Sequence, residues 1–192
     1  GDYLTNSCAI VPPAGDVVLE NNNATVSQMI VNAYDPNDKT EAHGDKILHS
    51  SFSTNDYLYY TIRFENTGNA SAINVRVTDI LDVKLNSSTL QMVGSSHPYV
   101  LDRVGNNLTW KFDNIQLPVS QQNTTVGKGY VTFKIKPNTN FAVGDIIPNT
   151  AAIYFDFNNP VITNTATTPV VLPTGIASYQ SAEKILLFPN PA

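Results

Sequence analysis

Oxygen-bearing side chains gather in one short stretch of the sequence, Asp35-Pro36-Asn37-Asp38. Three carboxylate or amide groups lie within four residues there, and Pro36 stiffens the backbone between them. Such a cluster suits a hard cation such as calcium, which takes about six to eight oxygen ligands. The stretch therefore predicts a structural calcium site with Asp35, Asn37 and Asp38 among its ligands.

Two loops further along the chain are predicted to complete this calcium site. Modules strung end to end need their termini at opposite ends, hence an odd number of strands. This places the loop 156–160 and the turn 65–69 at the end where residues 35–38 lie. The ligands expected from these loops are Asp156, Asn158 and Glu65. The alternative is that the same Asp and Asn side chains bond to nearby backbone groups and shape the turns.

The stretch 35–38 also resembles the Asp-x-Asn-Asp linker that binds calcium between cadherin repeats. This resemblance implies a calcium ion that rigidifies the junction between two modules. Removal of one ligand, as in Asp38→Ala, is then expected to weaken calcium binding.

The elements that must position these residues are β-strands, because apolar and polar residues alternate over most of the sequence and no helical period persists. Along one predicted strand, Leu58, Tyr60, Ile62 and Phe64 face the same side. The other inward-facing sets are Ile73, Val75 and Val77; Leu108, Trp110 and Phe112; Val131, Phe133 and Ile135; and Ala151, Ile153 and Phe155.

Shorter strands complete the predicted fold. They lie at 90–93, 99–103 and 161–171, with a hairpin loop at 104–107 and a poorly defined strand near 46–52. About eight or nine strands separated by turn residues predict an all-β fold, an immunoglobulin-like antiparallel β-sandwich. A jelly roll is the alternative.

One segment of the sequence occurs twice. Residues 1–10 read GDYLTNSCAI, and residues 144–153, which begin 143 positions later, read GDIIPNTAAI. Repetition at this length indicates domain-sized modules in series. We therefore expect residues 1–33 to be the C-terminal strands of a preceding module and residues 34–171 to form a complete one.

The single cysteine falls within this repeat. Cys8 cannot form an internal disulfide, because the sequence contains no second cysteine. Its counterpart in the second copy is Ala151. A small apolar residue on an inward strand position is expected in both copies, so we expect Cys8 to be a buried, inert thiol.

The alternation stops after residue 171. Residues 172–184 contain a Pro and a Gly without periodicity and are predicted to be a linker. Residues 185–192 end in FPNPA and resemble the start of the type A C-terminal sorting domain of the type IX secretion system. The resemblance implies export across the outer membrane by that machinery, followed by attachment to the surface or release.

Three separated blocks of the complete module carry a second resemblance. They are DPNDK at 35–39, YTIRFENTG at 60–68 and NTAAIYFDFN at 149–158. With these blocks, residues 35–171 resemble an uncharacterised immunoglobulin-like repeat domain of secreted Bacteroidota proteins. The resemblance implies a module at an extracellular or outer-membrane surface location, and it brings no catalytic activity with it.

Aromatic residues raise the possibility of carbohydrate binding. Tyr59, Tyr130 and Tyr154 alternate outward, and exposed aromatic rings on β-sandwich modules stack on sugars. Exposed tyrosines are also ordinary on sheets. Trp110, by contrast, alternates inward with Leu108 and is expected in the core.

Other classes of function find little support in the sequence. Eleven basic and 16 acidic residues give a net charge of −5 without a basic block, so nucleic acid is not an expected partner. No apolar run approaches the roughly 20 residues that span a bilayer. His43, His49 and His97 lack metal-ligand spacing, and no Ser or Cys has a nucleophile's setting. Asp79 and Asp82 follow a strand, where a capping or solvated role is expected.

Together these observations predict a non-enzymatic extracellular spacer or stalk module. Its expected partners are the type IX secretion machinery and neighbouring modules of the same chain. The alternative is an adhesive or carbohydrate-binding module that binds surface glycans. Such a module predicts an exposed aromatic or apolar patch where a spacer has a polar face.

Overall fold

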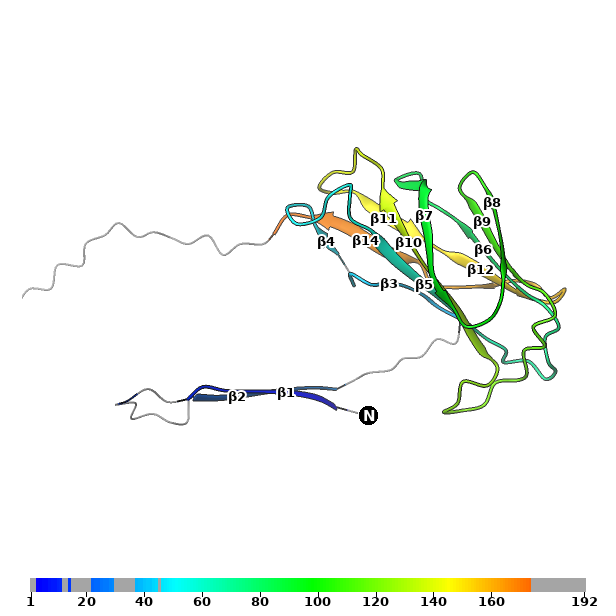
Figure 1. Ribbon diagram of the computed structural model, residues 1–192, viewed down its shortest axis with the longest axis horizontal. Helices are drawn as coiled ribbons and strands as arrows, with labels where there is room; N and C mark the ends of the chain where they lie inside the picture. Colours follow the sequence, from blue (N-terminus) through cyan, green and yellow to red (C-terminus); the bar gives the residue numbers. More distant parts are fainter. Residues whose placement is uncertain (1–2, 12–13, 15–21, 30–36, 45, 174–192) are drawn as a thin grey trace, which may run out of the picture. The chain divides into compact units, whose positions relative to one another are not determined.

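The computed structural model describes residues 3–11, 14, 22–29, 37–44 and 46–173, which form strands and loops (Figure 1). The chain divides into two compact units, Gly1–Pro36 and Asn37–Ala192. Most of the predicted linker and all of the predicted sorting segment, residues 185–192, lie outside the described residues. Within the described part, no helix is long and apolar enough to cross a membrane.

The described residues of the first unit form one antiparallel pair of strands. Strand β1 (Tyr3–Ala9) pairs with β2 (Asn23–Met29) along its whole length. The expectation of a buried Cys8 is wrong, because its side chain is exposed. A two-stranded sheet by itself has no second layer to cover a side chain. Its counterpart Ala151 lies inside a sandwich and is buried.

The second unit is a β-sandwich, and its first sheet has the strand order β3-β5-β10-β7. The strands are β3 (Lys39–Glu41), β5 (Leu58–Glu65), β10 (Lys128–Pro137) and β7 (Leu85–Ser95). All neighbours are antiparallel. The register between β10 and β7 shifts twice, and such irregularities increase the local twist of a sheet.

The second sheet has the order β13-β12-β6-β9-β8 and is also antiparallel. Its strands are β13 (Val161–Ile162), β12 (Ala151–Phe155), β6 (Val75–Ile80), β9 (Asn107–Phe112) and β8 (Val100–Val104). The predicted hairpin loop at 104–107 is confirmed between β8 and β9. Gly105 turns the chain there with a φ of 61°, a conformation that glycine adopts without steric cost.

A third, smaller sheet lies at one end of the sandwich, with the order β11-β14-β4. Its strands are β11 (Ile146–Asn149), β14 (Ala166–Val171) and β4 (Ile47–Leu48). Strands β14 and β4 are parallel. The predicted single strand 161–171 is therefore two strands in different sheets, because Thr163 and Asn164 between them direct their side chains to backbone groups.

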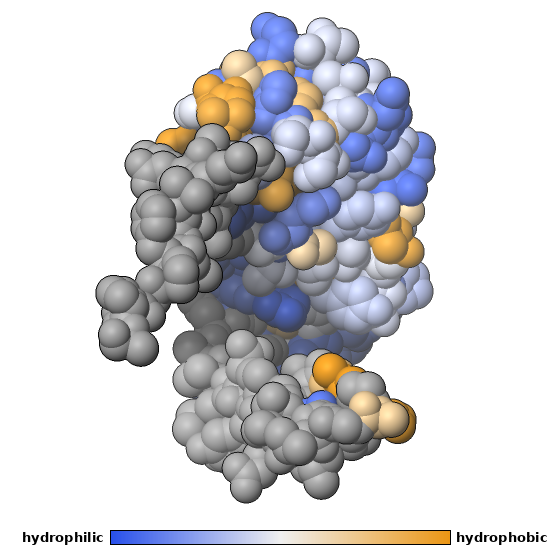
Figure 2. Space-filling model, turned by 90° about the vertical axis from the view of Figure 1, so that its left-hand side faces the viewer, coloured by the Kyte–Doolittle hydropathy of each residue, from blue (hydrophilic) through white to orange (hydrophobic). Residues whose placement is uncertain are grey.

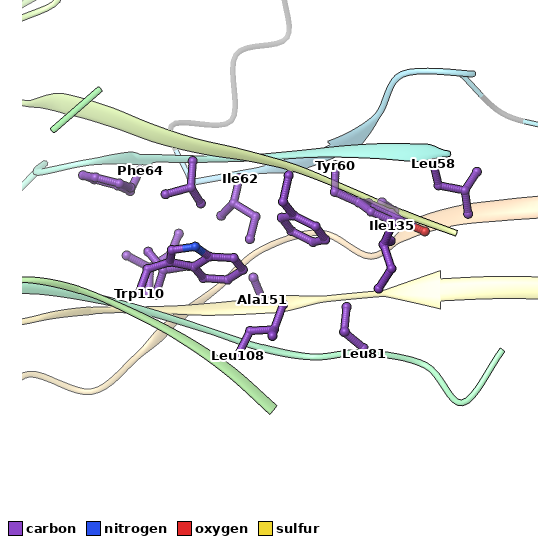
Figure 3. Packing of buried hydrophobic residues seen from close by; sticks show 14 of the residues in the cluster. Leu58, Tyr60, Ile62, Phe64, Leu81, Leu108, Trp110, Ile135 and Ala151 are labelled. Atoms are coloured by element: carbon purple, nitrogen blue, oxygen red, sulfur yellow. The ribbon is translucent and has the colours of Figure 1, made fainter. Parts of the chain in front are cut away.

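The core lies between the two large sheets, as Figure 3 shows. Tyr60, Ile62 and Phe64 reach inward from β5, and Leu108 and Trp110 reach inward from β9, all of them buried. Burying a large apolar side chain contributes roughly 1.5–3 kcal/mol, so these rows stabilise the contact between the sheets. The predicted antiparallel β-sandwich and the core position of Trp110 are confirmed.

Two details of the predicted strands are wrong. Ile73 is 52% exposed, because β6 begins only at Val75 and residue 73 belongs to the preceding turn. Strand β3 forms at residues 39–41, where no strand was predicted from the sequence. It pairs with β5 at the edge of the first sheet, with Lys39 opposite Ile62.

Candidate functional site

Two charged residues occupy inward positions in the sandwich. Along β6, the buried positions are Val75, Val77 and Asp79, so Asp79 continues the apolar row into the core. Along β3, Lys39 is buried while Thr40 is exposed. The expected capping or solvated role of Asp79 is therefore wrong, because the alternation of β6 runs two residues further than predicted.

Lys39 and Asp79 form an ion pair that joins the two large sheets. The Lys39 amine donates a hydrogen bond to Oδ2 of Asp79, and both side chains are completely inaccessible to solvent. Aromatic rings surround the amine, which lies 5.2 Å from the ring centre of Tyr60 and 5.6 Å from that of Phe133. Phe133 stacks in turn on Trp110, so the pair sits in the apolar core.

Burial disfavours the charged forms of both residues. Desolvation lowers the pKa of Lys39 from 10.5 to about 8, although the nearby Asp79 acts in the opposite direction. Desolvation also raises the pKa of Asp79, against the opposing effects of Lys39 and the side chain of Asn149. Burial thus brings the two pKa values closer together and lowers the cost of moving the shared proton from the amine to the carboxylate.

Asn149 lies beside this ion pair. It ends β11, two residues before Ala151, which is opposite Asp79 in the register of β12 and β6. The residue is 2% exposed. Its side chain approaches Asp79 closely enough to lower the pKa of that carboxyl group. Among the described residues, however, neither amide atom of Asn149 has a partner with hydrogen-bond geometry.

Unpartnered polar atoms concentrate around the pair. The described residues contain six buried side-chain nitrogen or oxygen atoms without a hydrogen-bond partner. Five of them belong to Tyr60, Asp79, Asn149 and Thr168. We call these four residues and Lys39 the buried polar cluster. An unpartnered buried polar atom costs about 1–3 kcal/mol, so the cluster is an energetically costly feature of this core.

The side chain of Asn164 forms hydrogen bonds with the backbone of Lys39. Its Oδ1 accepts a hydrogen bond from the Lys39 N–H at 2.8 Å, and its Nδ2 donates to the Lys39 carbonyl at 2.9 Å. Asn164 lies in the segment between β13 and β14. The two bonds fix the backbone of β3 and so hold the Lys39 side chain in the core.

Two of the predicted calcium ligands near the start of the sandwich, Asn37 and Asp38, have other partners. Asp35 lies outside the described residues. Asp38 forms an ion pair with Arg63, whose Nε donates to Oδ1 at 2.6 Å. Asn37 Oδ1 accepts a hydrogen bond from the backbone of Glu65 at 3.2 Å. Glu65 Oε2 is buried and has no hydrogen-bond partner among the described residues.

The loop residues predicted to complete the calcium site lie after β12. Asp156 accepts hydrogen bonds from the backbone of Ile73 at 3.1 Å and Asn74 at 2.7 Å, which is the alternative, turn-shaping role. Asn158 is exposed. Among the described residues, no group of three or more His, Cys, Asp or Glu side chains is placed to hold a metal ion. Calcium binding stays a prediction from the sequence.

The three tyrosines proposed for sugar binding do not form one patch. Tyr59 lies on β5 and Tyr130 on β10, 38% and 42% exposed, both in the first sheet. Tyr59 is opposite Lys134, four residues from Tyr130, which separates the two by about 13 Å. Tyr154 lies on β12 in the second sheet, where its ring contacts Arg76.

Comparisons with known proteins bear on both the fold and the family. The model of a family described as "Domain of unknown function (DUF7619)" matches residues 35–169. No curated protein matches the sequence.

Solved structures of pilins have a similar fold. A variant of BcpA, the major pilin subunit of Bacillus cereus, matches with 14% identity and a TM-score of 0.52, covering 70% of this chain and 40% of the pilin. The full-length major pilin SpaD of Corynebacterium diphtheriae matches with 19% identity and a TM-score of 0.52, covering 77% and 42%. The chain therefore spans about two fifths of either pilin, and the similarity is one of fold.

Proposed function

This chain belongs to the DUF7619 family of domains of unknown function, and we propose that it serves as a non-enzymatic spacer module of a protein displayed outside the cell. The β-sandwich is the load-transmitting unit, and neighbouring modules of the same chain are its partners. The fold shared with two pilin subunits supports this role.

The main support for the proposal is the attachment of the first strand of the sandwich, β3, to the segment that contains its last strand, β14. A spacer is pulled at its ends, and in this sandwich the chain enters at Asn37 and the last strand ends at Val171. The hydrogen bonds between Lys39 and Asn164 connect the first strand to the segment that leads into the last strand, β14. Strand β14 also lies against β3. Tension therefore loads several bonds at once before any strand can leave its sheet.

The route to the cell surface is the second part of the proposal. The FPNPA ending of the sequence supports type IX secretion, with the sorting machinery as a further partner. A surface or secreted location also suits a sandwich whose fold is shared with pilins.

An adhesive or carbohydrate-binding role is the second candidate. Phe157 favours it, because its side chain is fully exposed in the turn after β12. Figure 2 supports the spacer instead, since the visible face of the larger unit is mostly hydrophilic or neutral and its hydrophobic residues form separate groups. A polar face of this kind is expected of a module that does not bind a partner there.

Single-molecule pulling on the two ends of the 192-residue chain tests the spacer. The sandwich is expected to open in one cooperative event, and Asn164→Ala is expected to lower the opening force. Gradual opening at the same force in both proteins would contradict the proposal. A glycan array gives the second test, in which binding that disappears in the Tyr59→Ala/Tyr130→Ala/Tyr154→Ala variant would favour adhesion.

A further inference from the structure

We propose that Lys39 and Asn149 become joined by an intramolecular amide bond between their side chains, with Asp79 transferring the protons. The bond connects Nζ of Lys39 to Cγ of Asn149 and releases ammonia. It links strand β3, at the beginning of the sandwich, to strand β11 near its end. This inference is independent of the spacer function, because it rests on the buried polar cluster alone.

The placement of the three side chains is the first argument. Lys39 Nζ bonds to Oδ2 of Asp79, and the side chain of Asn149 lies against the same carboxyl group. The amine and the carboxamide therefore meet at one carboxyl group while coming from strands 110 residues apart in the sequence. Holding two reactants in contact replaces a bimolecular encounter, which is the largest obstacle to forming an amide from a weak electrophile.

The state of the amine is the second argument. Only a neutral amine has the lone pair needed for attack, and burial among Tyr60 and Phe133 lowers the pKa of Lys39 to about 8. The complete inaccessibility of both side chains excludes bulk water, which would otherwise compete as a nucleophile. The core thus prepares Lys39 as a nucleophile.

The unpartnered atoms of the carboxamide are the third argument. Asn149 Oδ1 and Nδ2 have no hydrogen-bond partner in the described part of the chain, and neither has Oδ1 of Asp79. Burial raises the pKa of Asp79, so its carboxyl group can hold a proton. A protonated Asp79 can donate to Asn149 Oδ1 and stabilise the negative charge that develops there during attack.

The reaction balances without a further reagent. Lys39 passes a proton to Asp79, and the neutral amine adds to Cγ of Asn149 to form a tetrahedral intermediate. Asp79 then accepts a second amine proton and delivers one to the departing nitrogen. The Cγ–Nδ2 bond breaks, and the departing ammonia takes the remaining proton from Asp79 and leaves as ammonium, so that Asp79 returns to its starting carboxylate form. No group is oxidised or reduced.

The bond would change how the module carries tension. A chain pulled from its ends would transmit the force from Lys39 to Asn149 without loading residues 40–148. Complete opening of the sandwich would then release only residues 150–171, about 80 Å of chain, instead of about 460 Å for residues 40–171.

Intact-mass measurement of the purified, denatured 192-residue chain tests the proposal. We expect a mass below that of the sequence by about 17 Da, the mass of one ammonia. Proteolysis should then yield one branched peptide containing both Lys39 and Asn149. Lys39→Met, Asp79→Ala and Asn149→Ala should each restore the mass expected from sequence, while the matched exposed-site variants Lys46→Met and Asn158→Ala should retain the loss.

Three results would overturn the proposal. One is a wild-type chain with the full mass of its sequence, a measurement that does not depend on whether any variant folds. Another is a loss of about 18 Da with Lys39 joined to Asp79, because a direct lysine–aspartate amide releases water. The last is a loss of about 17 Da confined to a single unbranched peptide, which would indicate cyclisation of an asparagine on its own backbone.

Discussion

The side-chain amide of Asn164 pairs with both backbone polar groups of Lys39, at 2.8 Å and 2.9 Å. Strand β3 is only three residues long, and it pairs with β5 alone in its sheet. Asn164 therefore supplies the contact that a second neighbouring strand would otherwise make. It also places the Lys39 side chain against Asp79.

We first predict that Asn164→Ala lowers the free energy of unfolding by about 2–4 kcal/mol, because two backbone groups of Lys39 lose their partners. Urea denaturation measures the change. Asn158→Ala, an exposed asparagine nearby in sequence, is the control and should have little effect. Equal stability of the two variants would show that the Lys39–Asn164 contact does not anchor β3.

The buried ion pair leads to the second prediction, which is tested in an Asn149→Ala background where no Lys39–Asn149 bond can form. Asp79→Leu should lower the free energy of unfolding by about 3–5 kcal/mol, because it leaves the Lys39 amine buried without its partner. Addition of Lys39→Met should recover most of this loss, since methionine fills the space without a charge. Failure of the second substitution to restore stability would contradict this account.

The pKa of Lys39 yields the third prediction. It is 10.5 in the unfolded chain and about 8 in the fold. Below pH 8 both states hold the proton, whereas between about pH 8 and 10.5 the unfolded state binds more protons. The contribution of Lys39 to the free energy of unfolding therefore rises with pH, by at most about 1.4 kcal/mol per pH unit.

Denaturation across this pH range compares Asn149→Ala with Asn149→Ala/Lys39→Met. The first protein should gain stability relative to the second as the pH increases. A constant difference between the two would mean that the pKa of Lys39 is not lowered by folding.

Fourth, Gly129→Ala should lower the free energy of unfolding by about 1–3 kcal/mol. A methyl group at Gly129 would overlap two ring carbons of Phe64, a fully buried core residue. Gly94→Ala is the matched control, because the nearest atom to its new methyl group would be 4.0 Å away in Tyr130. Thermal unfolding of both variants measures the difference, and similar melting temperatures would contradict the predicted overlap.

The fifth prediction concerns Asp156 and separates turn chemistry from calcium binding. Asp156→Ala should cost about 1–2 kcal/mol in a calcium chelator, because the backbone N–H groups of Ile73 and Asn74 lose their acceptor. If the sequence-predicted calcium site exists, millimolar calcium should stabilise the wild type and enlarge this loss. The same loss with and without calcium would leave Asp156 with its turn-shaping role only.

The hydrophobic core could be predicted from the sequence, because apolar residues recur at every second position of the strands that form it. Along β5, β9 and β10 every second residue is apolar, and the sandwich buries those rows. The short strands were harder to predict from the sequence, because β4 and β13 contain only two residues each. Such strands depend on their neighbours in space, and no periodic pattern can show them.

The buried polar cluster escaped prediction for a different reason. The alternation of Val75 and Val77 continues to Asp79, and this extension was the available signal. From the sequence alone, a charged residue at an inward position is interpreted as the end of the strand, since an unpaired charge is costly in a core. The partners that make it tolerable, Lys39 and Asn149, lie far away in sequence, and only the folded chain brings them together.

The position of Trp110 gives this protein its own optical reporter. It is the only tryptophan in the sequence, it is completely buried, and its ring stacks on Phe133 beside the sulfur of Met92. Its fluorescence therefore reports on the interior of the sandwich. A change in its emission during unfolding identifies the opening of this one core, without any label.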